Sequence, residues 1–292
     1  MRNFNFKVKY SCLVDNHGRY QRQGWLWLNS LIHFGKINPS DIFMHCVTGT
    51  GEDYIKKCAE TGANVVITEP YGDKTYCNKI AQMSDVQLKD SDAVILMDAD
   101  MIMLENFEDT LDFNYISAKI VNSPNPETSI IDKLFETAGI KKSLPDKAVE
   151  LTEDYFTYGA NFNGGLYVIP RKYYGIIKSG WEKWSQWLLI RENGKPLYDA
   201  KKEAHIDQIS FCMTVHENNI PVKYLSRLYN YPMPFDFTDR DKSENIERIP
   251  YVLHYHRQTD ENNLIALDYQ PAVNIKKAVE SANEFIKKYN KM

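Results

Sequence analysis

Two aspartates end an otherwise apolar run. Residues 92–104 read DAVILMDADMIML, so Asp98 and Asp100 follow a segment suited to a buried strand. A carboxylate buried without a partner is costly, so both acids must reach solvent, a cation or hydrogen-bond donors. Residues i and i+2 of an extended segment share a face, and two such carboxylates suit Mg²⁺ or Mn²⁺ held with a diphosphate. Acids that cap a turn or a helix are the simpler alternative.

The segments that must position these acids alternate in type. Apolar runs predict strands, and amphipathic runs predict helices, the first two of which stop at glycine. The strands are expected over 6–15, 41–49, 63–69 and 92–98, and the helices over 23–35, 52–62 and 76–88. This rhythm predicts an α/β chain with a parallel, doubly wound sheet and helices on both faces. Ligands bind at the carboxyl ends of such strands, where Asp15 and Asp98 fall.

The alternation is interrupted after residue 121. Residues 122–158 are rich in Pro, Ser, Lys and acids around one amphipathic piece, which indicates an excursion or lid. The strand pattern resumes at 163–169 and again at 249–256, and an amphipathic helix closes the chain at 274–292. Docking of that helix on its own domain is the favoured interpretation, although its lysines leave contact with an anionic membrane surface open.

Composition bounds the class of protein. The chain has 292 residues, 43% of them hydrophobic and 25% charged, as expected for a soluble globular protein of one large or two smaller domains. Its net charge of −4 gives no broad reason to expect nucleic-acid binding. Five cysteines without a C-x-x-C pair favour reduced thiols in a cytosol. We find no apolar signal core and no run of membrane-spanning length, so a cytoplasmic location is predicted, with no prediction of oligomeric state.

Two enzyme classes place D-x-D after an apolar strand. Haloacid-dehalogenase-like phosphatases use the first aspartate as nucleophile, but normally on the first strand and with a later acidic motif such as G-D-x-x-x-D. Here three predicted strands precede Asp98, and no such acidic motif follows. Nucleotide-sugar glycosyltransferases carry D-x-D after the strand that ends their nucleotide-binding half, and that placement fits this chain.

Six stretches, in order, resemble one family. They are YSCLVDNHGRYQRQGWLWLNSL at 10–31, the run from Asn78 to Phe113, FNGGLYVIP at 162–170, HIDQISF at 205–211, KYLSRLYNY at 223–231 and YVLHYH at 251–256. Together they resemble the glycogenin-like and lipopolysaccharide-galactosyltransferase-like glycosyltransferases, the family 8 group with the GT-A fold. The resemblance implies a Rossmann-like, mostly parallel central sheet flanked by helices, with a smaller mixed sheet in the acceptor half. It implies one domain, 1–292, with a nucleotide-binding half at 1–115, an acceptor and catalytic half at 116–270 and a terminal helix at 271–292.

The resemblance also implies a metal site. Asp98 and Asp100 match the D-x-D that binds Mn²⁺ or Mg²⁺, which in turn bridges the diphosphate of a UDP-sugar, and His254 matches the third protein ligand. A neutral imidazole beside two carboxylates suits Mn²⁺ better than an all-oxygen site would. His256 lies two residues on and shares a strand face with His254, so it is the alternative ligand. A hydrogen-bonded histidine on a half-buried strand is the simpler interpretation of either.

Further residues match the donor site of the family. The resemblance assigns contacts with the uracil, ribose, phosphates and sugar to Asp15, Asn16, Tyr20, Lys79, Asp98, Asn163 and Gly164. Simpler interpretations are a turn at 15–18, a solvated helix lysine and a strand bulge. The family continues after its histidine with Gly and Lys-Pro-Trp, whereas this chain reads HYHRQTDENN, so Arg257 is expected to supply the missing positive charge.

Asp207 and Gln208 match the D-Q segment near the reacting anomeric carbon, where the family transfers sugar with retention. Both a glycosyl-enzyme intermediate and front-face attack remain open. An amide is a poor nucleophile, so Gln208 and Asp207 are expected to stabilise positive charge and orient the sugar. An aspartate at a helix N-terminus is the alternative for Asp207. Three tryptophans at 181, 184 and 187 could stack on a glycan, but their spacing favours the core.

The sequence thus predicts a metal-dependent glycosyltransferase that moves a hexose from a UDP-sugar to the hydroxyl of a glycan, a lipid-linked glycan or a protein. A catalytically silent protein of the same fold that binds a nucleotide sugar or glycan is the second hypothesis. A D-x-D phosphatase is the third.

Overall fold

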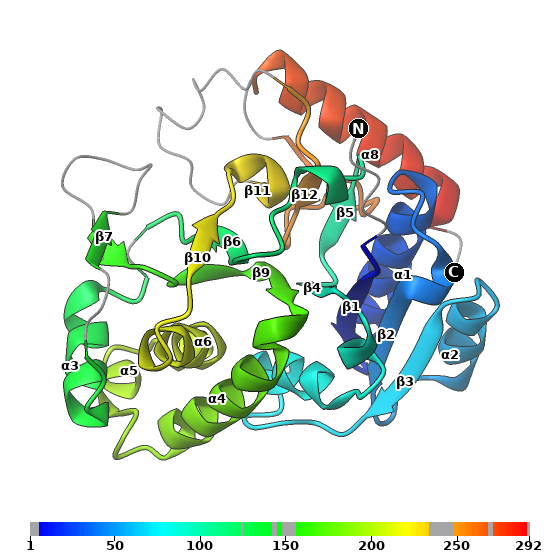
Figure 1. Cartoon of the computed structure of the whole chain (residues 1–292). Coiled ribbons are helices and arrows are strands. Elements are labelled where there is room, and N and C mark those ends of the chain that lie inside the picture. Colours follow the sequence, from blue (N-terminus) through cyan, green and yellow to red (C-terminus); the bar gives the residue numbers. More distant parts are fainter. Residues whose placement is uncertain are drawn as a thin grey trace. The chain divides into compact units, whose positions relative to one another are not determined.

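The computed structural model describes residues 6–123, 125–141, 145–147, 156–233, 248–267 and 271–290. Its strands form three sheets. The largest has seven strands in the order β10-β6-β9-β4-β1-β2-β3, a second has the order β11-β12-β5, and β7 pairs with β8 (Figure 1). In the second sheet β11 and β12 are parallel while β12 and β5 are antiparallel. The predicted α/β fold, with a mostly parallel central sheet, flanking helices and a smaller mixed sheet, is confirmed.

The four predicted early strands are present. They are β1 (Val8–Val14), β2 (Ile42–Val47), β3 (Asn64–Thr68) and β4 (Ala93–Met97). Every residue of β2 and β4 is buried, which explains why β4 is a continuous apolar run and why β2 is apolar except at His45. Strands β1 and β2 are parallel, with Val14 opposite Cys46, so their carboxyl ends reach the same edge of the sheet.

The chain folds into two compact units. Unit 1 comprises Met1–Lys9, Thr68–Leu96 and Asp112–Leu225, and unit 2 comprises Tyr10–Ile67, Met97–Leu111 and Ser226–Met292. Each unit is therefore assembled from three separate stretches of chain. The boundaries fall inside β1, β3 and β4, so each of these strands contributes residues to both units.

Unit 1 is built around two packed helices. Its strands include β6 (Ile116–Ile120), β9 (Phe162–Pro170) and β10 (Val222–Tyr224). Strand β6 lies between the other two and pairs parallel with β10 and antiparallel with β9. The helices α4 (Arg171–Leu189) and α6 (Ile206–Glu217) lie side by side (Figure 1). A Cβ at Gly180 would meet Thr214 Cγ2 at 2.3 Å, so the helices approach closely only because residue 180 has no side chain. The predicted core role holds for Trp181 and Trp184, which are buried.

Two smaller segments of unit 1 correspond to the predicted excursion at 122–158. Its described part contains α3 (Thr128–Ala138) and the antiparallel strands β7 (Pro145–Lys147) and β8 (Phe156–Tyr158). Gly139 ends α3 in the left-handed conformation, with φ of 68°. The remainder of the predicted lid lies outside the described residues.

Later in unit 1, a short helix α5 (Lys195–Asp199) and a 3₁₀ turn (Glu203–His205) precede α6.

The segment predicted as helical over 76–88 is helical over most of its length, but the helices are of the 3₁₀ type. The segment forms 3₁₀ helices at Tyr76–Ser84 and Leu88–Asp90. Its buried apolar side chains Cys77, Ile80 and Met83 recur every third residue, which suits three residues per turn better than 3.6. The Asp73 carboxylate accepts hydrogen bonds from the Thr75 and Cys77 N–H groups and so starts the tighter turn.

Unit 2 holds the remaining elements. They are α1 (Gly18–His33), α2 (Glu52–Ala59), β5 (Met101–Met103), β11 (Tyr231–Pro232), β12 (Val252–His254), α8 (Val273–Tyr289) and 3₁₀ turns at Pro39–Asp41, Glu108–Thr110 and Arg227–Tyr229. The strand predicted over 249–256 is thus shorter than expected. Helix α8 buries Ile275, Val279 and Ile286 in an apolar cluster that includes residues of α1 and β12, so its predicted docking on the domain is confirmed.

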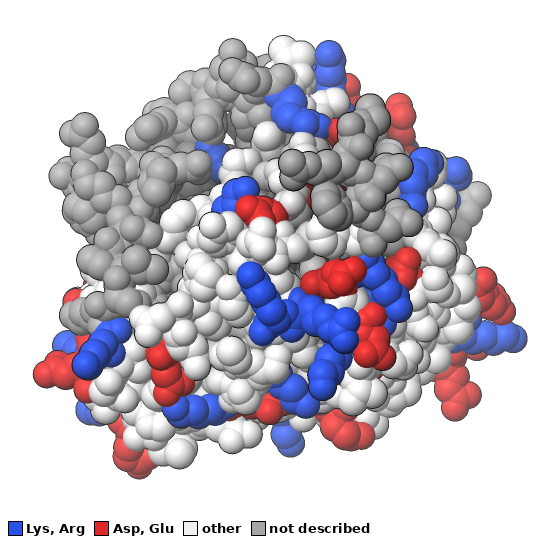
Figure 2. All heavy atoms as spheres, viewed as in Figure 1, with Lys and Arg blue, Asp and Glu red and all other residues white. Residues whose placement is uncertain are grey.

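The surface carries charges of both signs. Basic and acidic side chains lie interspersed on the face drawn in Figure 2, in keeping with the formal net charge of −4. Among the described helices, none has the length and hydropathy that crossing a bilayer requires.

Candidate active site

The D-x-D segment lies in a turn. Strand β4 ends at Met97 and β5 begins at Met101, with Ala99 and Asp100 forming the turn between them. The extended geometry expected for Asp98 and Asp100 is therefore wrong, because the chain must leave one sheet and enter another within three residues. Both aspartates are half-buried. The turn leaves both side chains partly accessible and does not hold them on one strand face.

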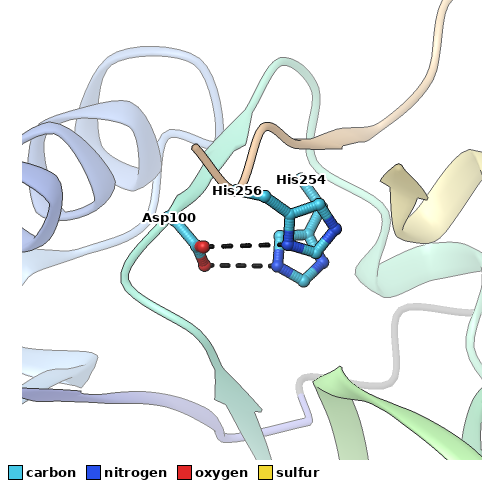
Figure 3. Close-up of side chains that lie close together, drawn as sticks. All are labelled: Asp100, His254 and His256. Atoms are coloured by element: carbon cyan, nitrogen blue, oxygen red, sulfur yellow. Dashed lines mark ion pairs between the residues drawn. The ribbon is translucent and has the colours of Figure 1, made fainter. Parts of the chain in front are cut away.

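Asp100 meets two histidines. His254 Nε2 lies 3.2 Å from Asp100 Oδ1, and His256 Nδ1 lies 3.8 Å from Asp100 Oδ2. Figure 3 shows both imidazoles facing the carboxylate, and their ring centroids are 3.7 Å apart. The three ligand atoms lie within 4.8 Å of one another. Asp98 is described but is not part of this cluster, so its role as a metal ligand stays a prediction.

Asn230 sets the orientation of His254. The His254 Nδ1 atom is 2.9 Å from Asn230 Oδ1, and both side chains are buried. An amide oxygen only accepts, so Nδ1 carries the proton and donates it to Asn230. In the neutral ring this leaves a lone pair on Nε2, which points at the Asp100 carboxylate. Two acceptors that face each other at 3.2 Å require a cation or a proton between them.

The electrostatics favour an ionised Asp100. Burial alone would raise the pKa of this carboxyl, but His254 and then His256 outweigh it, so the pKa lies well below its usual range. An anionic oxygen and two imidazole nitrogens form a donor set that fits a divalent transition metal. The convergence of these three side chains in the described part of unit 2 makes it the candidate metal centre.

The predicted uracil and ribose contacts lie at the carboxyl ends of β1 and β2. Asp15 is half-buried directly after β1, and Asn16 is exposed beside it. A Cβ at Gly49, in the loop after β2, would lie 3.2 Å from Asn16 Nδ2, so the Asn16 amide rests against that loop. Tyr20 is 38% exposed on the first turn of α1, where its ring can receive a stacked base. Arg257 is exposed in the turn after β12.

The predicted sugar and catalytic residues gather within unit 1. Lys79 Nζ lies 3.4 Å from Asp207 Oδ2 and donates to the Gly164 carbonyl oxygen at 3.1 Å. A Cβ at Gly164 would lie 3.4 Å from Gln208 Cγ, so four of the predicted residues lie together here. Asp207 is buried in the first turn of α6, where the helix dipole favours its negative charge. Asn163, beside Gly164 on β9, accepts a hydrogen bond from the Gly165 N–H at 3.0 Å.

Two residues support this site through contacts that the sequence analysis did not predict. Trp181 Nε1 donates to the Asp207 carbonyl oxygen at 2.7 Å and so anchors the start of α6 on α4. His205 Nδ1 lies 3.2 Å from Gln208 Nε2, and its Nε2 atom lies 3.0 Å from Asn125 Nδ2. A neutral imidazole has one N–H, so one of the two amides must present its oxygen to His205. His205 begins the HIDQISF stretch and Trp181 is the first of the three tryptophans, but the spacing of residues in neither stretch indicates these contacts.

Comparison with known proteins gives a fold. No family model and no curated protein sequence matches the chain. Among solved structures it is similar to the galactosyltransferase LgtC in complex with donor and acceptor sugar analogs, with 13% identity, a TM-score of 0.56 and coverage of 97% of each chain. An active-site mutant of LgtC aligns with a TM-score of 0.58 at 14% identity, again over 97% of each chain. Mouse xyloside xylosyltransferase 1 aligns with a TM-score of 0.52 at 14% identity, over 87% of this chain and 99% of that one. The chain therefore has the GT-A fold of these glycosyltransferases.

Proposed function

We propose that this chain is a metal-dependent glycosyltransferase that moves a hexose from a UDP-sugar to the hydroxyl of a glycan, lipid-linked glycan or protein. One observation carries the proposal: Asp100 and His254 converge directly after β4 of a GT-A fold, with the His254 lone pair aimed by Asn230. The six stretches that resemble family 8 support membership of that family. They also support its single-domain organisation, with nucleotide-binding residues at 1–115 and catalytic residues at 116–270.

The metal centre has a defined task in this proposal. Asp100 and His254 would hold the ion, and Asp98 is proposed as a donor contact and as the further ligand that the D-x-D resemblance implies. A divalent metal there would neutralise the negative charge that develops on the departing UDP. Asn230 accepts the hydrogen bond of His254 Nδ1, which leaves Nε2 available to the ion.

The donor is proposed to be read by residues at strand ends. Asn16 can hydrogen-bond the edge of uracil, Asp15 can accept from ribose hydroxyls, and the exposed Tyr20 ring can stack on the base. Arg257 is proposed to add a positive charge for the phosphates. These assignments agree with the exposure of Asn16, Tyr20 and Arg257 and with the shared edge of the parallel strands β1 and β2.

The sugar is proposed to lie against the Lys79, Gly164, Asp207 and Gln208 group, with Asn163 beside it. The absence of a side chain at Gly164 lets a ligand approach the β9 backbone. The carboxylate of Asp207 is held by the Lys79 ammonium, so it can stabilise positive charge at the anomeric carbon and orient sugar hydroxyls without rotating. Gln208 is proposed to act in the same way. Transfer is expected to retain the anomeric configuration by one of the two routes left open above.

The cellular location and the binding partners are also proposed from the sequence. The chain is proposed to act in the cytoplasm on a glycan-type acceptor, with contact at a membrane surface through exposed lysines of α8. Nucleic acid is not an expected partner.

Thermal shift and turnover test the proposal together. Wild-type protein is incubated with UDP-glucose, UDP-galactose, UDP-N-acetylglucosamine or UDP, with and without Mn²⁺, and UDP release is measured alongside. We expect Mn²⁺-dependent stabilisation and slow UDP release. Asp100→Asn should lose both the Mn²⁺-dependent stabilisation and the UDP release. Without metal and nucleotide it should melt at the wild-type temperature. Asp109→Asn, an exposed acid of the same unit, is the matched control and should behave as wild type.

Each other outcome identifies a competing function. Stabilisation by a UDP-sugar without release or transfer to any acceptor hydroxyl would indicate a silent binding protein. Hydrolysis of phosphomonoesters without a response to uridine nucleotides would indicate a phosphatase. If no uridine nucleotide stabilises the protein in the presence of metal, the proposed function is wrong.

A further inference from the structure

His256 has a left-handed backbone. Its φ is +49°, in a region that few residues with a Cβ adopt, although histidine adopts it more often than most, and it lies two residues after the end of β12. Such conformations persist where the surrounding structure holds them, and they concentrate at functional sites. The left-handed turn changes the direction of the chain at the residue whose imidazole faces Asp100.

Two side chains of α1 hold this conformation. Arg19 Nη2 and Gln23 Nε2 each donate to the His256 carbonyl oxygen at 3.3 Å. They are four residues apart, so they lie on one face of the helix. Gln23 is buried, which restricts its amide to this orientation. The contacts act on the backbone of His256, and its imidazole faces Asp100.

The main chain ties the three candidate ligands together. The Tyr255 N–H donates to the Asp100 carbonyl oxygen at 3.0 Å, and the His254 carbonyl accepts from the Met233 N–H at 2.8 Å. The Tyr255 bond links the segment between the two histidines directly to the turn that carries the aspartate. These bonds, together with those to the His256 carbonyl oxygen, hold the main chain at all three residues.

The separations suit direct ligation by one ion. Ligands at about 2.1 Å from a metal lie about 3.0–3.5 Å from one another in octahedral or tetrahedral sites. His254 Nε2 lies 3.2 Å from Asp100 Oδ1 and His256 Nδ1 lies 3.8 Å from Asp100 Oδ2, so the two histidines meet different oxygens of the carboxylate. One ligand atom from each residue gives a set within 4.8 Å, so the His256 ring must move inward for all three residues to bind one ion. Two imidazoles and one carboxylate form a set that favours transition metals, whereas Mg²⁺ prefers oxygen ligands and retains its waters.

We propose that His256 is a third resident ligand beside Asp100 and His254, and that this two-histidine site binds Mn²⁺, Co²⁺ or Zn²⁺ before any nucleotide and discriminates against Mg²⁺. Asn230 orients one imidazole and the Arg19–Gln23 pair positions the other. The use of this ion in sugar transfer rests on the proposed function, but its binding does not.

Calorimetry on the full-length, metal-free protein without nucleotide tests the binding. We expect one Mn²⁺, Co²⁺ or Zn²⁺ per chain and at least 100-fold weaker binding of Mg²⁺. His256→Ala should weaken Mn²⁺ binding at least tenfold. His256→Asn is the companion variant, because asparagine tolerates the left-handed backbone, and it should weaken binding similarly. His33→Gln, which removes a half-exposed imidazole at the far end of α1, should leave the affinity unchanged.

Pulsed electron paramagnetic resonance of the Mn²⁺ complex counts the nitrogen ligands. Wild-type protein should show two coupled imidazole nitrogens, and both His256 variants should show one. Gln23→Leu should weaken binding while two nitrogens remain, since it removes a positioning contact and no ligand. If the His256 variants bind Mn²⁺ with wild-type affinity, or the wild type shows a single nitrogen, the inference is wrong. That result would leave the proposed function standing as long as UDP-sugar turnover still requires Asp100. If two nitrogens are found but no UDP-sugar is turned over, the proposed function is wrong and the inference about metal binding stands.

Discussion

At the scale of single residues, the candidate active site depends on the missing side chain at Gly164. A Cβ there would come within 3.1 Å of Lys79 Nζ and 3.4 Å of Asp207 Oδ2. Gly164→Ala should therefore displace the flexible end of Lys79 and loosen its pair with Asp207, with less than about 1 kcal/mol lost from the free energy of unfolding. UDP-sugar turnover should fall at least tenfold, measured beside urea unfolding.

Gly175→Ala is the control for that substitution. Gly175 lies in α4 of the same unit, and a Cβ there meets nothing within 4 Å. Alanine is the better helix former by about 0.8–1 kcal/mol, so this variant should be slightly more stable and fully active. Unchanged turnover in Gly164→Ala would show that the space at residue 164 is not needed for the donor.

His205 gives a prediction on pH. Burial, and then the charge of Lys202, lowers its pKa below the ordinary value. The unfolded chain therefore takes up the proton first, and stability is lost as the pH falls through about 6.5 towards the lowered folded value. His205→Gln should remove this part of the loss, so urea midpoints at pH 7.5 and 5.5 should differ less than in wild type. Burial also lowers the pKa of His33, so the urea midpoints of His33→Gln at the two pH values show how much of the pH dependence comes from a second histidine. An unchanged pH dependence in His205→Gln would contradict the assignment.

At the scale of elements, the sequence predicts the strands well and the connections poorly. The buried strand β4 is a continuous apolar run and β2 is apolar except at His45, and runs this short that alternate with amphipathic segments favour strands over helices. The turn at Asp98–Asp100 could not be predicted, because the same letters fit an extended strand end until β5 joins a different sheet. The 3₁₀ helix at Tyr76–Ser84 was hidden for a related reason, since a spacing of three is compatible with either helix type.

The support of the metal site was equally hidden. Asn230 and His254 are 24 residues apart and meet only because β11 and β12 pair in parallel, with Pro232 opposite His254. The left-handed turn at His256 depends on α1, more than 230 residues earlier. Residue types near a motif can therefore identify candidate ligands, whereas their orientation depends on contacts between distant segments.

Helix α8 makes a prediction at this scale. Phe285 is buried against Phe34, with ring centroids 5.2 Å apart, and Asn283 exchanges two hydrogen bonds with the Ile265 backbone. Phe285→Ala should lower the free energy of unfolding by about 3–5 kcal/mol. Glu284→Ala, at an exposed neighbouring position, should change it by less than about 0.5 kcal/mol.

Since the apolar face of α8 is already used in packing, any binding of the protein to anionic vesicles should be reversed by salt. Vesicle binding that resists 0.5 M salt, a concentration at which the Debye length is only about 4 Å, would contradict this account.

At the scale of the whole molecule, the division of the chain predicts how it unfolds. Neither unit is a continuous segment, and β1, β3 and β4 each contain residues of both. Unfolding one unit must therefore disrupt strands of the other, which favours a single cooperative transition. The five cysteines are buried and distributed between the units: Cys77 and Cys212 in unit 1, and Cys12, Cys46 and Cys58 in unit 2.

These thiols make the prediction measurable. Burial raises the pKa of Cys46 to about 12 and of Cys58 to about 11, and it also raises the pKa of Cys77 and Cys212, so the native thiols should resist alkylation. In mild urea, mass spectrometry should find all five labelled at one common rate, because each requires global opening. Mn²⁺ and UDP should slow that common rate by the factor 1 + [L]/Kd, since a ligand that binds only the folded chain depletes the open form. Faster labelling of Cys77 and Cys212 than of the other three would show that unit 1 opens alone, and the shared strands would then not couple the two units.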